Sequence, residues 1–131
     1  MIKIYVDTCV YVDLFEKNNR KSLLAFDFFA KGWNCAFELV VSDWVRSELK
    51  RRGLDSNFPQ LFDQFKKKNK LFIIKHTDEE LRLAKSKSEH WQDYLHYLIA
   101  KKAGCDKIVT CDKDFISSFE SIFDITYPEN I

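Results

Sequence analysis

Short apolar runs recur along the chain, and the intervals between them carry the spacing of helices. Five of these runs have the length and composition of buried strands: residues 2–6, 37–41, 71–74, 107–110 and 123–127. Strands joined by helical crossovers pair in parallel, because each helix returns the chain to the same end of the sheet. The order of segments therefore predicts an α/β fold: a three-layer α/β/α sandwich with a mostly parallel central sheet.

Helix start and stop signals fill the intervals between the predicted strands. Apolar periodicity predicts helices over residues 9–15, 21–31, 44–52, about 58–68, 91–102 and 114–119, and another that begins near Thr77. Ser42 or Asp43 is expected to cap the helix after the second strand. Gly32, Gly53 and Gly104 are expected to stop helices.

The composition leaves room for one domain with one core. Hydrophobic residues fill 46% of the 131 positions, and twelve Phe stand against three Gly and two Pro, which is unlike a disordered chain. We therefore expect a single domain over residues 1–131. The formal net charge is only +1, so any attraction to nucleic acid must come from local basic patches.

The sequence predicts no membrane association. Its apolar start is interrupted at Asp7, too early for a signal peptide, and no apolar run approaches the ~18 residues of a membrane-spanning helix. The four cysteines show neither a CxxC pair nor the spacing of a Cys/His metal site: Cys9, Cys35, Cys105 and Cys111. We expect a cytoplasmic protein with reduced, partly buried thiols.

Two acids follow two of the predicted strands. Asp7 comes directly after the first, and Asp112 lies two residues after Thr110. In an open parallel sheet, ligands bind beyond the carboxyl ends of the strands. One acid at such an end is ordinary, but two on different strands of one sheet predict a site.

Two more acids lie in predicted helices. Glu48 can simply pair with Arg51 or Arg52 at helical spacing, and Asp93 suits the positive end of a helix dipole. Converging carboxylates would raise one another's pKa unless a cation were present. Mg²⁺ prefers carboxylate oxygens and can activate water for phosphodiester hydrolysis. The four acids together predict a metal-dependent nuclease that needs no nucleophilic side chain.

These residues lie in segments that resemble the PIN domain, especially the VapC-type toxin ribonucleases. Residues 4–10, IYVDTCV, resemble the family's first strand, which ends in DTS or DTN, and residues 42–49 resemble its segment with a Ser before a Glu-Leu pair. Residues 93–100, DYLHYLIA, are similar to its DALHAAxA helix. Residues 104–115, GCDKIVTCDKDF, closely follow its GADxLVTxDxDF ending. The resemblance extends over almost the whole chain, in the same order.

The resemblance implies an endoribonuclease that cleaves single-stranded RNA with Mg²⁺ or Mn²⁺. It implies that the metal ligands and catalytic acids are Asp7, Glu48, Asp93 and Asp112, with Asp114 as a fifth ligand or as the operative alternative to Asp112. It also implies that Thr8 and Thr110 help to position water or substrate. Departures from the pattern are Cys9, where Ser or Asn is commoner, and the bulky residues Tyr94, Tyr97 and Leu98 in the third segment.

The same resemblance implies the toxin of a type II toxin–antitoxin system, with an antitoxin protein as partner and a homodimer as its assembly. Arg46 belongs to a basic cluster with Lys50, Arg51 and Arg52. Near a carboxylate site, that cluster could hold RNA phosphates, although a solvated helix face is an equal interpretation. His96 is expected to pack rather than to bind a metal, since it has no partner at metal-site spacing.

Other functions remain open on the sequence. A PIN-like RNA-processing nuclease would carry the same acids, and a catalytically inactive RNA- or protein-binding module would keep the sheet without metal affinity. A haloacid-dehalogenase-type phosphatase needs Asp-x-Asp after the first strand, where this chain has Cys9. A response-regulator receiver needs a pair of acids near its start, and that pair is absent from the sequence.

Overall fold

Five parallel strands form the central sheet of the protein. The computed structural model describes residues 1–16, 20–87 and 90–131. The strands are β1 (Lys3–Val6), β2 (Glu38–Ser42), β3 (Leu71–Ile74), β4 (Lys107–Val109) and β5 (Ile125–Thr126). Their order across the sheet is β3-β2-β1-β4-β5, and every neighbouring pair is parallel. This confirms the predicted parallel sheet.

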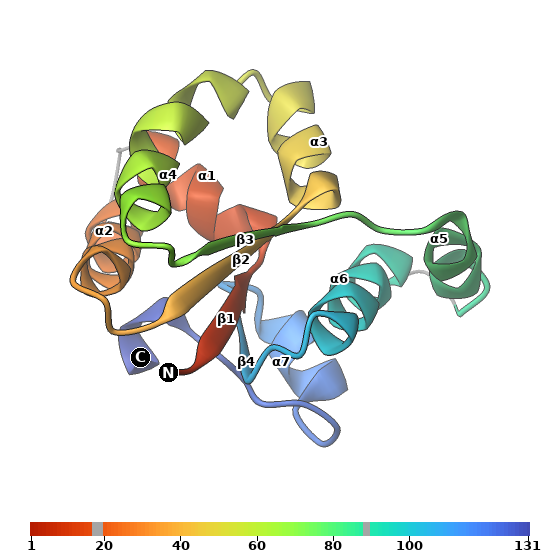
Figure 1. Ribbon diagram of the computed structural model, residues 1–131. Helices are drawn as coiled ribbons and strands as arrows, with labels where there is room; N and C mark the ends of the chain where they lie inside the picture. Colours follow the sequence, from red (N-terminus) through yellow and green to blue (C-terminus); the bar gives the residue numbers. More distant parts are fainter. Residues whose placement is uncertain (17–19, 88–89) are drawn as a thin grey trace.

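Helices cover both faces of this sheet (Figure 1). One face carries α1 (Thr8–Glu16), α2 (Arg20–Trp33) and α4 (Phe58–Lys67); the other carries α6 (Trp91–Lys102) and α7 (Lys113–Phe119). The remaining helices are α3 (Asp43–Arg51), α5 (Asp78–Lys85), and the short 3₁₀ turns η1 (Asp55–Asn57) and η2 (Pro128–Asn130). The three-layer α/β/α architecture is therefore confirmed.

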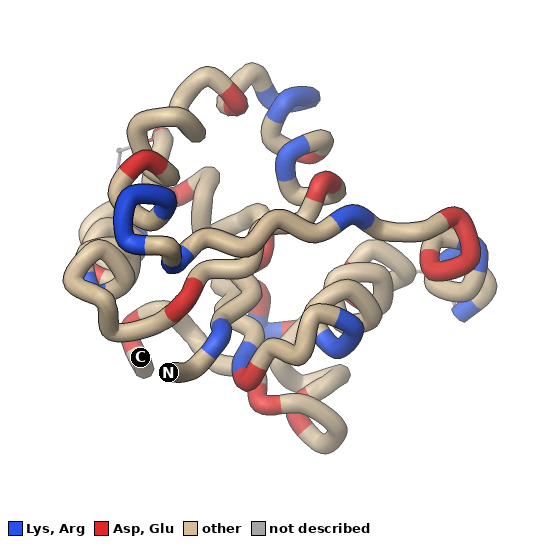
Figure 2. The backbone as a smooth tube through the Cα atoms, viewed as in Figure 1, with Lys and Arg blue, Asp and Glu red and all other residues tan. Residues whose placement is uncertain are grey.

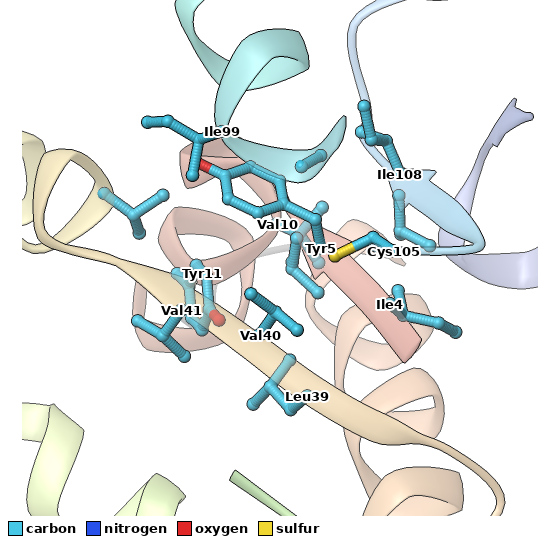
Figure 3. Packing of buried hydrophobic residues seen from close by; sticks show 14 of the residues in the cluster. Ile4, Tyr5, Val10, Tyr11, Leu39, Val40, Val41, Ile99, Cys105 and Ile108 are labelled. Atoms are coloured by element: carbon cyan, nitrogen blue, oxygen red, sulfur yellow. The ribbon is translucent and has the colours of Figure 1, made fainter. Parts of the chain in front are cut away.

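The core lies in two layers, one on each side of the sheet. Successive side chains of a strand point to opposite faces, and Tyr5 of β1 points towards α6, beside Ile99 (Figure 3). On the other face, Tyr11 of α1 packs against Phe29 of α2 and Phe58 of α4, at ring distances of 5.2 and 5.6 Å. Both tyrosines are fully buried. The two layers hold β1 rigidly and thereby fix the position of the residue that follows it.

Helix ends follow the predicted capping residues in most places. Ser42 caps α3, since its Oγ accepts a hydrogen bond from the Val45 N–H at 3.1 Å. Gly53 and Gly104 follow α3 and α6 in the left-handed conformation, each with φ near +71°. Within the described part of the chain, no helix combines the length and apolar character needed to span a bilayer.

Gly32 does not stop a helix, contrary to our prediction. It lies inside α2, which continues to Trp33. A Cβ at this position would come within 2.6 Å of the Phe65 ring and 2.7 Å of the Phe37 ring. The glycine is needed for the close approach of α2 to its neighbours rather than for a turn.

The sheet order reverses between β1 and β4. From β1 the chain moves outwards through β2 to β3, then crosses back to β4 on the other side of β1. Helices after β1 and β4 consequently leave towards opposite faces, and in sheets of this kind ligands bind beyond the carboxyl ends of two such strands. Asp7 and Asp112 follow these two strands.

Candidate active site

Asp7 is held rigidly at the carboxyl end of β1. Its side chain is buried, and the Thr8 backbone N–H donates to Oδ1 at 2.8 Å. The Thr110 hydroxyl donates to Oδ2 at 2.8 Å. Both oxygens therefore have a fixed direction, as a preorganised ligand requires.

Thr110 also links Asp7 to the second strand end. Its Oγ1 accepts a hydrogen bond from the Asp112 backbone N–H at 3.1 Å. Asp112 is exposed and caps α7, since its Oδ1 accepts from the Asp114 N–H at 2.9 Å. Asp114 lies on the exposed first turn of the same helix. One buried hydroxyl thus ties the ends of β1 and β4 together.

Glu48 belongs to α3 and contacts two residues that also contact Asp7. Its Oε1 accepts a hydrogen bond from the Thr8 hydroxyl at 2.7 Å and one from His96 Nε2 at 3.1 Å. Among the described residues, Oε2 has no hydrogen-bond partner. Thr8 therefore contacts two of the predicted acids, one through its N–H and one through its hydroxyl.

His96 lies between the two acids and is 2% exposed. Its Nε2 is 3.1 Å from Glu48 Oε1 and 3.3 Å from Asp7 Oδ1, so this nitrogen carries a proton. Its Nδ1 forms a hydrogen bond of 2.6 Å with the Tyr5 hydroxyl, which in turn bonds Ser42 Oγ at 2.8 Å. The chain of contacts connects the core of the sheet to the carboxylates.

The opposite charges of His96 and Glu48 stabilise each other. Burial opposes the charged form of His96, but the Asp7 charge and the hydrogen bond that His96 donates to Glu48 raise the pKa of His96 above its ordinary value. Burial raises the pKa of Glu48, but His96 and Thr8 outweigh burial and lower it overall. Both shifts favour an imidazolium beside ionised carboxylates.

Asp93 lies in the first turn of α6 and faces Asp7 and Asp112. Burial and the charges of those two acids raise the pKa of Asp93 to about 6 from its ordinary value of 3.8. Within the described residues its carboxylate has no hydrogen-bond partner. Burial and like charges therefore oppose the ionised form of Asp93.

The donor set fits a hard divalent cation, because carboxylates that repel one another are the groups that such an ion joins. In the present arrangement, no three His, Cys, Asp or Glu side chains of the described residues form a metal-binding cluster. Because Asp7 is held in place, a shared cation would require Asp93 and the exposed Asp112 to move towards it. Glu48, in contrast, already accepts hydrogen bonds from His96 and Thr8.

Comparison with solved structures identifies the architecture. Seven chains are similar, among them the crystal structure of Mycobacterium tuberculosis VapC20, a sarcin–ricin loop cleaving toxin. The two folds agree with a TM-score of 0.63 over 88% of this chain and 94% of VapC20, at 16% sequence identity. This chain has a PIN-like fold. No protein-family model and no curated protein sequence matches it.

A disulfide lies near the carboxyl ends of β1 and β4 in this PIN-like fold. Cys9 of α1 is joined to Cys111, which directly precedes Asp112. Our prediction of reduced thiols is therefore wrong for this pair, while Cys35 and Cys105 are free. No local pattern predicts this bond, because the two residues are 102 positions apart and meet only through the pairing of β1 with β4.

Arg46 precedes Glu48 by two positions on α3. It is exposed on α3, with its guanidinium 5.6 Å from the centre of the Phe58 ring. Together with Lys50 and the acids Asp43 and Asp55, it lines a hollow of about 310 Å³. Lys and Arg are gathered on α3 and at the end of α4 (Figure 2).

Sequence reasoning missed the part of the site that lies beneath the acids. His96 joins two carboxylates instead of only packing, and Tyr5 and Ser42 support it from the sheet. A signal existed, since Tyr5 lies between Ile4 and Val6 and Ser42 follows three apolar residues of β2, and buried polar groups need partners.

Proposed function

We propose that this protein is a Mg²⁺- or Mn²⁺-dependent endoribonuclease of the VapC toxin type, which cleaves single-stranded RNA. The observation that carries the proposal is Asp93, a half-buried acid that has no hydrogen-bond partner among the residues that the structure describes. Burial and the charges of Asp7 and Asp112 raise its pKa to about 6. Placing a half-buried carboxylate beside two others costs free energy in a purely structural position, and it is typical of carboxylates that bind a cation.

In this proposal Asp7, Asp93 and Asp112 would hold the ion, with Asp114 as an outer ligand. When bound, the cation would lower the pKa of a water molecule and offset charge on the scissile phosphate. Thr110 keeps Asp7 and the Asp112 backbone in register through its single hydroxyl. Thr8 and His96 fix Glu48 Oε1 and leave Oε2 to accept a hydrogen bond from a water or a ribose hydroxyl.

The substrate would approach the exposed acids across α3. Arg46 and Lys50 offer exposed cations there, and cations that contact phosphates position RNA without reading its sequence. The neighbouring fold of VapC20 belongs to a toxin that cleaves the sarcin–ricin loop, so a structured RNA loop is a reasonable substrate to include. By the same likeness we propose an antitoxin partner, a homodimer and a cytoplasmic location.

Cleavage of labelled RNA tests the proposal. Purified wild type would be incubated with a single-stranded RNA and with a sarcin–ricin hairpin, in Mg²⁺, in Mn²⁺ and in EDTA. We expect metal-dependent cleavage that Asp7→Asn and Asp93→Asn each reduce by about 100-fold or more. Asp27→Asn is the matched control, since Asp27 is exposed on α2 and removes the same charge outside the site.

Folded wild type that neither cleaves RNA nor binds Mn²⁺ in calorimetry would contradict the proposal. That result would favour the inactive binding module. Cleavage that persists in EDTA and in both site variants would instead exclude a carboxylate-bound metal as the source of activity.

A further inference from the structure

Cys9 and Cys111 connect the two strand ends that carry the candidate acids. Cys9 lies two residues after Asp7, and Cys111 lies directly before Asp112. Their Cα atoms are 6.2 Å apart, within the range of roughly 4.4–6.8 Å that a disulfide spans. Because the pairing of β1 with β4 fixes this separation, the two thiols meet without rearrangement of the sheet.

The sulfur of Cys9 touches the hydrogen-bond system of Asp7. Cys9 Sγ lies 3.5 Å from Asp7 Oδ2 and 3.5 Å from Thr110 Oγ1, and it accepts a hydrogen bond of 3.1 Å from the Cys111 N–H. A reduced Cys9 can donate its S–H to the Asp7 carboxylate. A Cys9 in a disulfide has no S–H, so the oxidation state of the pair changes the surroundings of Asp7.

Small reagents can reach the pair. Cys9 and Cys111 are both half-buried, and Cys111 lines a surface pocket of about 130 Å³ together with Lys21 and Tyr127. Cys105, in contrast, is buried, and neither it nor Cys35 is bonded to another cysteine. The accessible pair is thus the one beside the candidate site.

We propose that Cys9 and Cys111 form a reversible redox pair that reacts with low-molecular-weight thiols and disulfides, and that its oxidation lowers the activity of the site. The second half of this proposal rests on the nuclease function proposed above. The first half, reversible formation of the bond, stands on the geometry of the two cysteines alone.

The exchange reaction is balanced with a disulfide such as oxidised glutathione. The thiolate of one cysteine attacks a sulfur of the reagent, which breaks the reagent's S–S bond and releases one thiol. The second cysteine then attacks the mixed disulfide, forms the Cys9–Cys111 bond and releases a second thiol. The protein sulfurs are oxidised, the reagent is reduced, and the two cysteine protons end on the two released thiols.

Oxidation acts on the site in two ways. It removes the S–H donor beside Asp7 Oδ2, and it ties residue 111 to α1, which limits the freedom of Asp112 to move towards Asp7 and Asp93. Those three carboxylates must draw together around a cation. Since loss of an outer hydrogen-bond partner commonly weakens metal affinity or activity by about 10- to 100-fold, we expect a decrease of about tenfold.

The test measures the bond and the activity separately. Wild type is equilibrated in glutathione buffers of increasing oxidised fraction, trapped with a thiol-alkylating reagent and mapped by mass spectrometry. We expect a reversible Cys9–Cys111 cross-link, with RNA cleavage about tenfold slower in the oxidised sample. Cys9→Ser and Cys111→Ser should lose the difference between oxidised and reduced samples, whereas Cys35→Ser should keep the wild-type ratio.

Each remaining outcome decides the question. Failure of the two cysteines to cross-link in excess oxidant, or equal cleavage rates in both states, would overturn the redox proposal. If the reduced protein cleaves no RNA, the nuclease proposal fails, and the glutathione titration alone then judges the reversible Cys9–Cys111 bond. In that case, weaker Mn²⁺ binding by the oxidised form would support the effect of the bond on the site, and equal binding would refute that effect.

Discussion

Nε2 of His96 lies 3.1 Å from Oε1 of Glu48, although the two residues belong to different helices and are 48 positions apart. The same nitrogen is 3.3 Å from Asp7 Oδ1. Because His96 is buried and bonded to Tyr5 on its other side, the imidazole cannot turn away from the carboxylates. It orients two acids of the candidate site and is itself almost completely buried.

Substitutions of His96 should show whether it acts by orienting the two acids through hydrogen bonds or by its own charge. His96→Ala leaves the Tyr5 hydroxyl and Glu48 without their buried partner, so we expect a loss of about 2 kcal/mol in the free energy of unfolding. His96→Gln restores a donor of similar reach and should recover part of both stability and cleavage. Urea unfolding and kcat measurements check this, and a purely packing role predicts that His96→Leu would rescue as well as His96→Gln.

Asp93 should make the metal-free protein less stable at neutral pH. The pKa of Asp93 in the folded protein, about 6, lies above its ordinary value of 3.8. Between these two pH values, the folded state therefore binds more protons than the unfolded state. The contribution of Asp93 to stability therefore falls as pH rises from about 4 to about 6. Asp93→Asn should raise the free energy of unfolding at pH 8 by about 1 kcal/mol, after allowance for solvent screening of a half-buried group.

The measurement for Asp93 is urea unfolding in EDTA at pH 4 and pH 8. The advantage of Asp93→Asn should shrink towards pH 4, where the wild-type carboxyl is largely protonated. Asp27→Asn serves as the control on the exposed face of α2. An equal advantage at both pH values would show that the Asp93 charge does not strain the fold.

The fold could be predicted from the sequence because it depends on periodicity. Alternating strands and helices determine a parallel sheet, and the order of the acids along the chain places Asp7 and Asp112 at strand ends. Gly32 shows where this reasoning fails: its signal as a helix stop is local, whereas its cause is the Phe65 ring, 33 positions away.

The candidate site was harder to predict because its contacts join distant elements. His96 meets Glu48 only after α3 and α6 have packed, and Cys9 meets Cys111 only after β1 has paired with β4. The strand boundaries also shifted, as β2 extends to Ser42 and β5 is limited to Ile125–Thr126. Single-sequence patterns describe each segment but not the partner that it finds.

Gly32→Ala should test the close approach of α2 to the core. The added methyl would lie 2.6 Å from the Phe65 ring, so the rings must shift at a cost of about 1–3 kcal/mol. Asp27→Ala, on the exposed face of the same helix, should change stability by no more than about 0.5 kcal/mol. Comparable stability of the two variants in urea unfolding would mean that the aromatic rings yield freely.

The comparison of Asp112→Asn with Asp114→Asn decides which acid completes the candidate site. The charge of Asp112 helps to raise the pKa of Asp93, whereas Asp114 is not among the causes of this pKa shift. Asparagine also caps helices, so Asp112→Asn should preserve α7 while removing one charge. We expect this variant to lower the pKa of Asp93, as measured by carboxyl NMR titration in EDTA, and to reduce metal-dependent cleavage by about 100-fold.

Asp114→Asn should leave the Asp93 titration unchanged and reduce cleavage far less. The reverse ranking would assign the operative role to Asp114, and an Asp93 titration that neither variant moves would place both acids too far from it to share a cation.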